Sequence, residues 1–146
     1  MIHRVSLAVE DDDAEYYVIK FAVEETGMPI DLCRVADGEQ ALFFLEKSHG
    51  FEVAPRPDLI LLNVNLPKRT GLEVLEQVRN SESLRSIPIV MFTSSSLATE
   101  RQKALALGAK DFVWKPHTLS ALLETLRSVC SRFLSDGVAN DAKASH

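Results

Sequence analysis

Cysteine is scarce in this sequence. Only two, Cys33 and Cys130, occur among 146 residues, and they lie far apart in the chain. Disulfide-stabilised domains are typically small, secreted and rich in cysteine, so this scarcity predicts reduced, partly buried thiols and no disulfide framework. Residues Met1 to Val5 also lack the charged-then-apolar layout of a secretory signal. We therefore expect a cytoplasmic protein.

Long apolar runs and basic runs are missing as well. Apolar runs are short: Leu59 to Leu62, for example, is only as long as a strand, whereas a membrane-spanning helix needs roughly 20 apolar residues. Lysine and arginine total 16 against 21 aspartates and glutamates, which gives a net charge of −5. An acidic chain without a basic run is a poor candidate for binding nucleic acid. Neither a membrane nor a nucleic acid is an expected partner.

Short apolar segments alternate regularly with amphipathic segments. Strands are predicted at 5–9, 30–35, 59–62, 89–92 and 111–114, and each is followed by a segment with helical periodicity. The segment 59–62 is uniformly apolar, which is typical of a central parallel strand covered on both faces. Strict alternation predicts an α/β fold, namely a five-stranded parallel sheet, doubly wound, with right-handed crossovers and helices on both faces.

Polar residues stand where four of these strands end. They are Glu10 and Asp11 after the first strand, Asn63 and Asn65 after the third, Thr93 after the fourth and Lys115 after the fifth. Ligands in such folds bind beyond the carboxyl ends of the strands, so we expect one shared pocket. Carboxylates with neighbouring oxygens suit Mg²⁺, and a lysine beside a hydroxyl suits a phosphoryl group. The pocket predicts metal-assisted phosphoryl chemistry.

The motifs at these positions resemble those of CheY-like receiver domains of two-component response regulators. The matching segments are Val9-Glu10-Asp11-Asp12, Asp37-Gly38, Pro57 to Pro67 with Gly71, Thr93-Ser94, Gly108-Ala109 and Lys115-Pro116. Each motif alone is common, but the full set occurs in the right order and spacing. The resemblance implies a flavodoxin-like (βα)5 fold over residues 2–134. The composition of 135–146 predicts a flexible tail.

Two features are similar to the single-domain regulators that pair with bacterial phytochromes. One is the longer connection from Lys47 to Pro57, and the other is the extended last helix. The resemblance implies that the partner is a sensor histidine kinase, of the phytochrome type in this subgroup. No output domain is expected after residue 134, so signalling should proceed by protein contact and not by an enzymatic activity of the chain.

The resemblance also implies how the pocket would hold Mg²⁺. Asp11 would be the main side-chain ligand, and Glu10 would act mostly through metal-bound water. The residue at position 63 would be a further ligand. Asn65 would offer its backbone carbonyl oxygen to the metal.

The remaining motif residues would handle the phosphoryl group and its readout. Thr93 would hold a phosphoryl oxygen, and its movement would report phosphorylation. Lys115 would pair with the acidic cluster at rest and with phosphate when active, and a cis peptide bond before Pro116 would place it. Phe112 matches the aromatic switch position of the family.

Phe112 and Trp114 lie two apart on a predicted strand, so they share a face of the sheet. Packing in the core is one interpretation. The other is a partner surface formed by the fourth helix, the fifth strand and the fifth helix, through which a homodimer would form. The sequence leaves both open.

Asn63 stands where the family has the aspartate that takes phosphate from a histidine kinase. An amide lacks the anionic oxygen needed to form an acyl phosphate, so this form should not be phosphorylated there. Two carboxylates remain in place of three, which predicts weaker Mg²⁺ binding. The amide nitrogen can also donate to Glu10 or Asp11. An engineered block and a naturally divergent receiver both fit this substitution.

These residues bear on three candidate functions. The first is a receiver seen in a form that cannot accept phosphate. The second is an atypical receiver that acts as a phosphate-independent binding or dimerisation module. A Mg²⁺-dependent phosphohydrolase is disfavoured, because neither Asn63 nor Asn65 is the aspartate that such an enzyme needs.

Overall fold

A computed structural model of the chain describes residues 3–93 and 98–134. Within them five strands and five helices alternate without exception. In chain order they are β1 (Arg4–Val9), α1 (Asp13–Glu25), β2 (Ile30–Val35), α2 (Gly38–Glu46), β3 (Leu59–Asn63), α3 (Gly71–Arg79), β4 (Ile89–Thr93), α4 (Ala98–Ala106), β5 (Asp111–Trp114) and α5 (Leu119–Leu134). The predicted alternation is confirmed, element by element.

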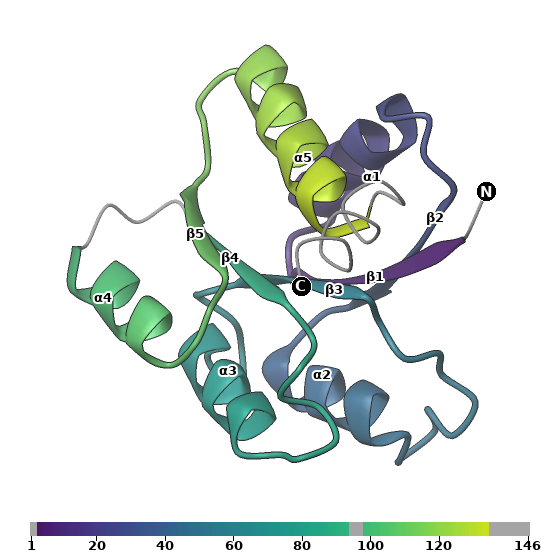
Figure 1. Ribbon diagram of the computed structural model, residues 1–146, viewed down its shortest axis with the longest axis vertical. Coiled ribbons are helices and arrows are strands. Elements are labelled where there is room, and N and C mark those ends of the chain that lie inside the picture. Colours follow the sequence, from purple (N-terminus) through teal and green to yellow (C-terminus); the bar gives the residue numbers. More distant parts are fainter. Residues whose placement is uncertain (1–2, 94–97, 135–146) are drawn as a thin grey trace, which may run out of the picture.

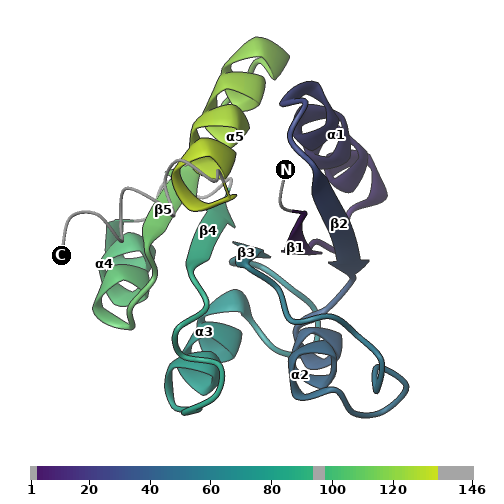
Figure 2. The same ribbon diagram turned by 45° about the vertical axis from the view of Figure 1, so that its right-hand side comes forward.

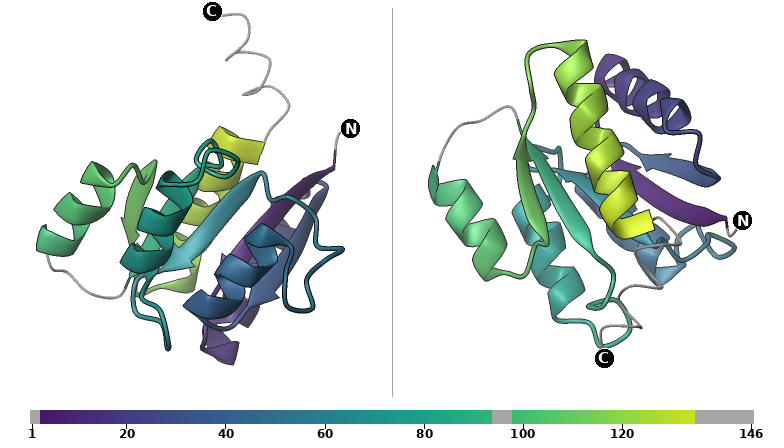
Figure 3. Two further views of the ribbon diagram at one scale, coloured as in Figure 1. Left: turned by 90° about the horizontal axis from the view of Figure 1, so that it is seen from below. Right: turned by 45° about the horizontal axis from the view of Figure 1, so that its top comes forward.

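The strands form one parallel sheet in the order β2-β1-β3-β4-β5. Helices α1 and α5 cover one face, and α2, α3 and α4 cover the other (Figures 1 and 2). The right-hand view of Figure 3 shows α1 and α5 side by side, and these two helices are in contact. The strand order reverses direction between β1 and β3, and in doubly wound sheets this reversal opens a crevice at the carboxyl ends.

The apolar core is divided by the sheet into two clusters. Because side chains alternate along a strand, Leu59 and Leu61 of β3 pack beneath α1 and α5, whereas Ile60 and Leu62 pack toward α2 and α3. Every residue of β3 and β4 is buried. A fully buried leucine or isoleucine contributes about 1.5–3 kcal/mol. The central strands therefore anchor the strand ends that carry the pocket.

Four helices, α1, α2, α3 and α5, begin at side-chain caps, which fix the loops that enter them. The Asp12 carboxylate accepts from the backbone N–H of Glu15 at 3.1 Å, and Asp37 accepts from Gln40 at 2.8 Å. Thr70 forms a reciprocal capping box at the start of α3. The cap at Asp12 is the most consequential, because it holds the turn that carries the acidic motif.

Both cysteine thiols are free, as predicted. Cys33 packs against the cluster on the α2–α3 side and Cys130 belongs to the cluster beneath α1 and α5, so the sheet separates them. In the part of the chain that is described, no helix is long and apolar enough to cross a membrane. The predicted cap residues Ser94 to Ser96 and the predicted tail at 135–146 lie outside the described residues.

Candidate functional site

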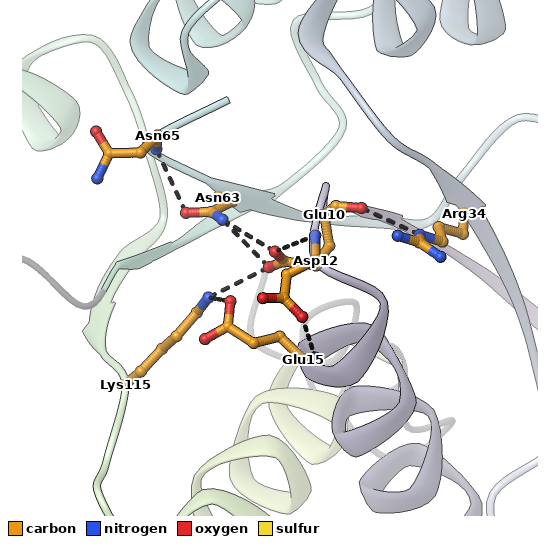
Figure 4. A network of polar contacts seen from close by, with 7 residues as sticks. All are labelled: Glu10, Asp12, Glu15, Arg34, Asn63, Asn65 and Lys115. Carbon is orange, nitrogen blue, oxygen red and sulfur yellow. Dashed lines mark hydrogen bonds and ion pairs between the residues drawn. The ribbon is translucent and has the colours of Figure 1, made fainter. Parts of the chain in front are cut away.

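Glu10 is buried at the end of β1 and forms the centre of a polar network (Figure 4). Its backbone N–H donates to the Val35 carbonyl oxygen at 3.1 Å, so β1 and β2 hold it in register. Its own carbonyl oxygen accepts from the Arg34 Nε at 3.0 Å. The Asp12 backbone N–H donates to Glu10 Oε1 at 3.2 Å. A carboxylate that is buried and fixed this firmly has one available orientation, toward β3 and β5.

Asn63 faces Glu10 from the end of the central strand. Its Nδ2 donates to both carboxylate oxygens of Glu10, at 3.2 Å each, while its Oδ1 accepts from the Asn65 backbone N–H at 3.3 Å. Donation to Glu10 is one of the two contacts expected from the sequence. The amide of Asn63 is thus satisfied at both ends, and neither of its two terminal atoms is an anionic oxygen.

Gly71 keeps the β3–α3 loop close to this amide. A Cβ at Gly71 would collide with the backbone oxygen of Asn63 and would lie 2.9 Å from the Cα of Val64. The Gly71 backbone N–H also donates to the Val64 carbonyl oxygen at 2.8 Å. Only glycine permits this approach, so the motif glycine positions the residue at the acceptor position.

Lys115 closes the network from β5. Its ammonium lies 3.2 Å from Glu10 Oε2 and 2.8 Å from Glu15 Oε2 (Figure 4). The Lys115 backbone N–H donates to the Thr93 carbonyl oxygen at 2.7 Å, which ties the ends of β4 and β5 together. The lysine side chain is only 12% exposed. It is therefore a pocket residue, paired in this structure with Glu10 and Glu15.

The other residues proposed for the pocket lie on the adjacent turns. Thr93 is fully buried at the end of β4, and Asn65 follows the β3 strand end. Asp11 is exposed on the β1–α1 turn. Among the described residues there is no group of three or more His, Cys, Asp and Glu side chains arranged to share one metal ion. Any cation here would depend on two carboxylates together with amide and carbonyl oxygens.

The electrostatics of Glu10 follow from its burial. Desolvation raises the pKa of this carboxyl above its ordinary value, and the nearby Glu15 carboxylate raises it further. The Lys115 ammonium and the Asp12 N–H oppose that rise. The ionised form of Glu10 thus depends on the lysine.

Sequence reasoning missed two residues of this network. Glu15, in the first turn of α1, is the closer of the two carboxylates that contact Lys115. Arg34, in β2, forms an ion pair with Asp13 at 2.8 Å and stacks over the Tyr16 ring at 4.8 Å. A cation within a mostly apolar strand was a signal for Arg34. No comparable signal marked Glu15, because acidic residues are ordinary in the first turn of a helix.

One prediction about this region is wrong. The described residues contain no cis peptide bond, so the Lys115–Pro116 bond is trans and not cis. Trans is the favoured isomer of an X–Pro bond by about 0.5–1 kcal/mol. The long lysine side chain reaches Glu10 from a trans backbone.

Phe112 and Trp114 project from the same side of β5 but differ in burial. Phe112 is partly buried against the cluster on the α3–α4 side, while Val113 between them packs on the opposite cluster. Trp114 is 57% exposed, and its ring meets His117 edge-on with centroids 6.5 Å apart. Phe112 therefore packs against the core, whereas Trp114 lies on the surface.

A five-stranded parallel sheet with a polar network at its carboxyl ends defines a domain of the doubly wound α/β class, and comparison with known proteins identifies its family. Residues 7–127 match the family described as response regulator receiver domain. The chain belongs to this family. Receiver domains act in two-component signalling, with histidine kinases as partners, and as a class they are signalling modules.

Several similar proteins are phytochrome response regulators. Response regulator Rcp1 of Synechocystis sp. is 30% identical over 131 residues, which cover 90% of this chain and 89% of that protein. A solved structure of its Mn(2+)-bound form aligns with TM-score 0.85 over 91% of this chain and 96% of that one. Phosphorylated RcpA, a cyanobacterial phytochrome response regulator, aligns with TM-score 0.87 at 30% identity over 92% and 96% of the two chains. The bacteriophytochrome response regulator RtBRR is 38% identical, with TM-score 0.73 over 86% and 78%.

Proposed function

We propose that this chain is a single-domain receiver of a two-component phosphorelay, held in a form that cannot be phosphorylated at position 63. The observation that carries the proposal is the orientation of the Asn63 amide. Its nitrogen points at Glu10, and its oxygen is engaged by the Asn65 backbone. A phosphoacceptor needs an anionic oxygen free to attack phosphorus, and a neutral amide supplies none.

The donor set of the pocket fits a hard divalent cation. Glu10 and Asp11 would provide carboxylate oxygens, Asn63 an amide oxygen and Asn65 its backbone carbonyl oxygen. Oxygen ligands are those that Mg²⁺ and Mn²⁺ prefer, and Mn²⁺ in the Rcp1 structure supports this reading. A bound Mg²⁺ would neutralise developing charge on phosphoryl oxygens. With one carboxylate fewer than an aspartate form, the affinity of this pocket for Mg²⁺ should be lower.

The remaining pocket residues would read a phosphoryl group if position 63 could carry one. Lys115 would exchange its carboxylate partners for phosphate oxygens, since its ammonium already lies at the mouth of the network. Thr93 would donate its hydroxyl to a phosphoryl oxygen. Phe112, partly buried on β5, would follow the movement of Thr93 as the switch residue.

The partner would be a sensor histidine kinase of the phytochrome type, and the names of RcpA and RtBRR support that choice. A homodimer would form through the face of α4, β5 and α5. Three exposed apolar side chains on these elements support this surface: Leu105, Trp114 and Leu119. Exposed aromatic side chains are frequent interface anchors.

The direct test is phosphorylation by a small phosphodonor with Mg²⁺. Asn63→Asp should acquire one acid-labile phosphoryl group, while the unchanged chain should acquire none. Asn65→Asp is the matched control, because it adds the same charge two residues along and should stay unlabelled. Labelling of the unchanged chain, or an unlabelled Asn63→Asp protein, would contradict the proposal.

A second candidate is a phosphate-independent module, and one feature of the pocket favours it. The polar groups of Glu10, Asn63 and Lys115 satisfy one another without a ligand. This function predicts the same dimerisation, measured by sedimentation, for the unchanged chain and for phosphorylated Asn63→Asp. A shift in the dimer dissociation constant on phosphorylation would favour the first candidate.

A further inference from the structure

Glu15 holds a position in the pocket that no motif assigns. It lies in the first turn of α1, and its backbone N–H is fixed by the Asp12 cap at 3.1 Å. From there its carboxylate reaches across to the Lys115 ammonium at 2.8 Å, a shorter contact than the 3.2 Å from Lys115 to Glu10 (Figure 4). Lys115, at the end of β5, thus contacts both the end of β1 and the start of α1, and Glu15 is its nearer anionic partner.

The charges around Lys115 explain why this contact matters. Without Glu15, the ammonium would face only Glu10 within contact range and would neutralise it. Glu10 already accepts from the Asn63 amide and from the Asp12 N–H. A carboxylate neutralised and bonded in this way has little negative potential left for a cation. With Glu15 present, the ammonium is shared, and Glu10 keeps part of its charge.

Glu15 also offsets the one ammonium of the pocket. Lys115 contacts two carboxylates, those of Glu10 and Glu15, so one negative charge of this trio is left over. That surplus is present with asparagine or with aspartate at position 63, but it matters more beside the neutral Asn63 amide.

We propose that Glu15 is a positioning residue: by pairing with Lys115 it shares the ammonium, leaves Glu10 part of its negative charge and so preserves divalent-cation binding at Glu10 and Asp11. This inference rests on the cation site of the proposed function. It adds to that site a residue of α1, outside the strand-end motifs.

An ordinary surface ion pair is the competing explanation for the contact. The Glu15 side chain is 44% exposed, and exposed pairs contribute little to stability. Its partner, however, is 12% exposed and also contacts a carboxylate that is 3% exposed. Solvent and salt screen such a partly buried group less than a surface pair, so loss of the Glu15 charge should lower the affinity of the site for a cation. A surface pair would leave cation affinity unchanged.

The experiment titrates Mg²⁺ alone into the unchanged chain, Glu15→Gln and Glu25→Gln, by calorimetry and by the fluorescence of Trp114, the single tryptophan. Glu25 ends the same helix, ten residues and about 15 Å from Glu15, so it controls for loss of one charge on α1. Glu15→Gln should weaken Mg²⁺ binding about tenfold. Glu25→Gln should leave it unchanged. Glu15→Gln and Glu25→Gln are also measured in the Asn63→Asp background, where tighter Mg²⁺ binding keeps the dissociation constants within the measurable range.

A second measurement reports the position of Lys115 without any metal. Acetylation by a small amine reagent, followed residue by residue, should be several-fold faster at Lys115 in Glu15→Gln. The exposed Lys110 serves as the internal reference. This rate responds to the pairing of Lys115. Because Lys115 is the one lysine among the described residues that is not exposed, urea unfolding of Glu15→Gln is measured alongside, and an unchanged stability assigns the faster rate to the lost contact.

The outcomes separate this inference from the proposed function. If Asn63→Asp binds Mg²⁺ and Glu15→Gln has no effect in either background, Glu15 has no positioning role and the inference is overturned. The same holds if Glu15→Gln binds more tightly. If no variant binds Mg²⁺, the cation site of the proposed function fails and this inference fails with it. The acetylation rate would then still show whether Glu15 holds Lys115.

Discussion

Two cations tie together opposite ends of the same sheet, and their partners differ in kind. Where β4 and β5 begin, Arg79 donates to three backbone carbonyl oxygens: Gly108 at 3.1 and 2.9 Å, Arg85 at 2.6 Å and Ile87 at 3.2 Å. Where these strands end, Lys115 binds two carboxylates, Glu10 and Glu15. One cation is held by neutral groups and the other by charged groups.

This difference separates a structural contact from an exchangeable one. Neutral carbonyl oxygens bind a guanidinium through directional hydrogen bonds, which depend little on salt and have no titration of their own. Carboxylates bind an ammonium largely through charge, and a divalent cation or a phosphoryl group can compete for either side of the pair. The end of the sheet with charged partners is therefore the end whose contacts an added ion can replace.

The largest expected effect lies at the end held by Arg79. Arg79→Ala removes all four hydrogen bonds and should lower the free energy of unfolding by about 3 kcal/mol. Arg79→Lys should recover only part of the loss, because lysine lacks the planar fork that reaches separate carbonyls. Urea unfolding with and without Mg²⁺ measures both. A deficit that Mg²⁺ repairs would contradict the distinction between the two ends.

A smaller effect is expected from Asn63→Asp in the absence of metal. The variant replaces a donor to Glu10 by a second carboxylate at the same distance, so two buried anions repel each other where hydrogen bonds had been. The unfolding free energy should fall by about 2 kcal/mol. Millimolar Mg²⁺ should recover most of this loss, because it binds the folded state alone. An equally large loss in saturating Mg²⁺ would mean that the pocket holds no cation.

The fold and part of the site could be predicted from the sequence, because both depend on the topology of the sheet. The fold was predictable because it depends on patterns repeated along the whole chain: the apolar run of β3, the helical stripe of α5 and the turn glycines. Glu10, Asn63 and Lys115 were predictable because parallel strands end at one edge, and there they do contact one another. Strand-end position is a property of the topology and requires no side-chain detail.

The features that could not be predicted depend on side-chain rotamers and loop geometry. Glu15 is one of several acids near the start of α1, and only its side-chain direction distinguishes it from Asp13. The isomer of the Lys115–Pro116 bond is a local feature that strand-end position does not determine, and the motif alone predicted the wrong one. Arg79 sits in a charged last turn of α3, where nothing in the sequence shows which carbonyls it will reach.

The smallest expected effect tests the charged end by pH. Lys115→Met removes the ammonium that opposes the raised pKa of Glu10, so that pKa should rise further in the folded protein. A carboxyl whose folded pKa lies above its unfolded value stabilises the fold at low pH, and this contribution is lost as pH rises through the folded pKa. Lys115→Met should therefore cost about 1 kcal/mol at pH 7, since Asn63 and Asp12 still bond Glu10.

The deficit of Lys115→Met should shrink as pH falls toward the ordinary glutamate value of 4.5, because protonated Glu10 no longer needs a counter-charge. Urea unfolding at several pH values measures the trend. Arg79→Ala is the control, since its partners are carbonyl oxygens and its deficit should stay constant over the same range. A Lys115→Met deficit that does not change with pH would place Lys115 in the same class as Arg79, as a structural tie rather than a counter-charge.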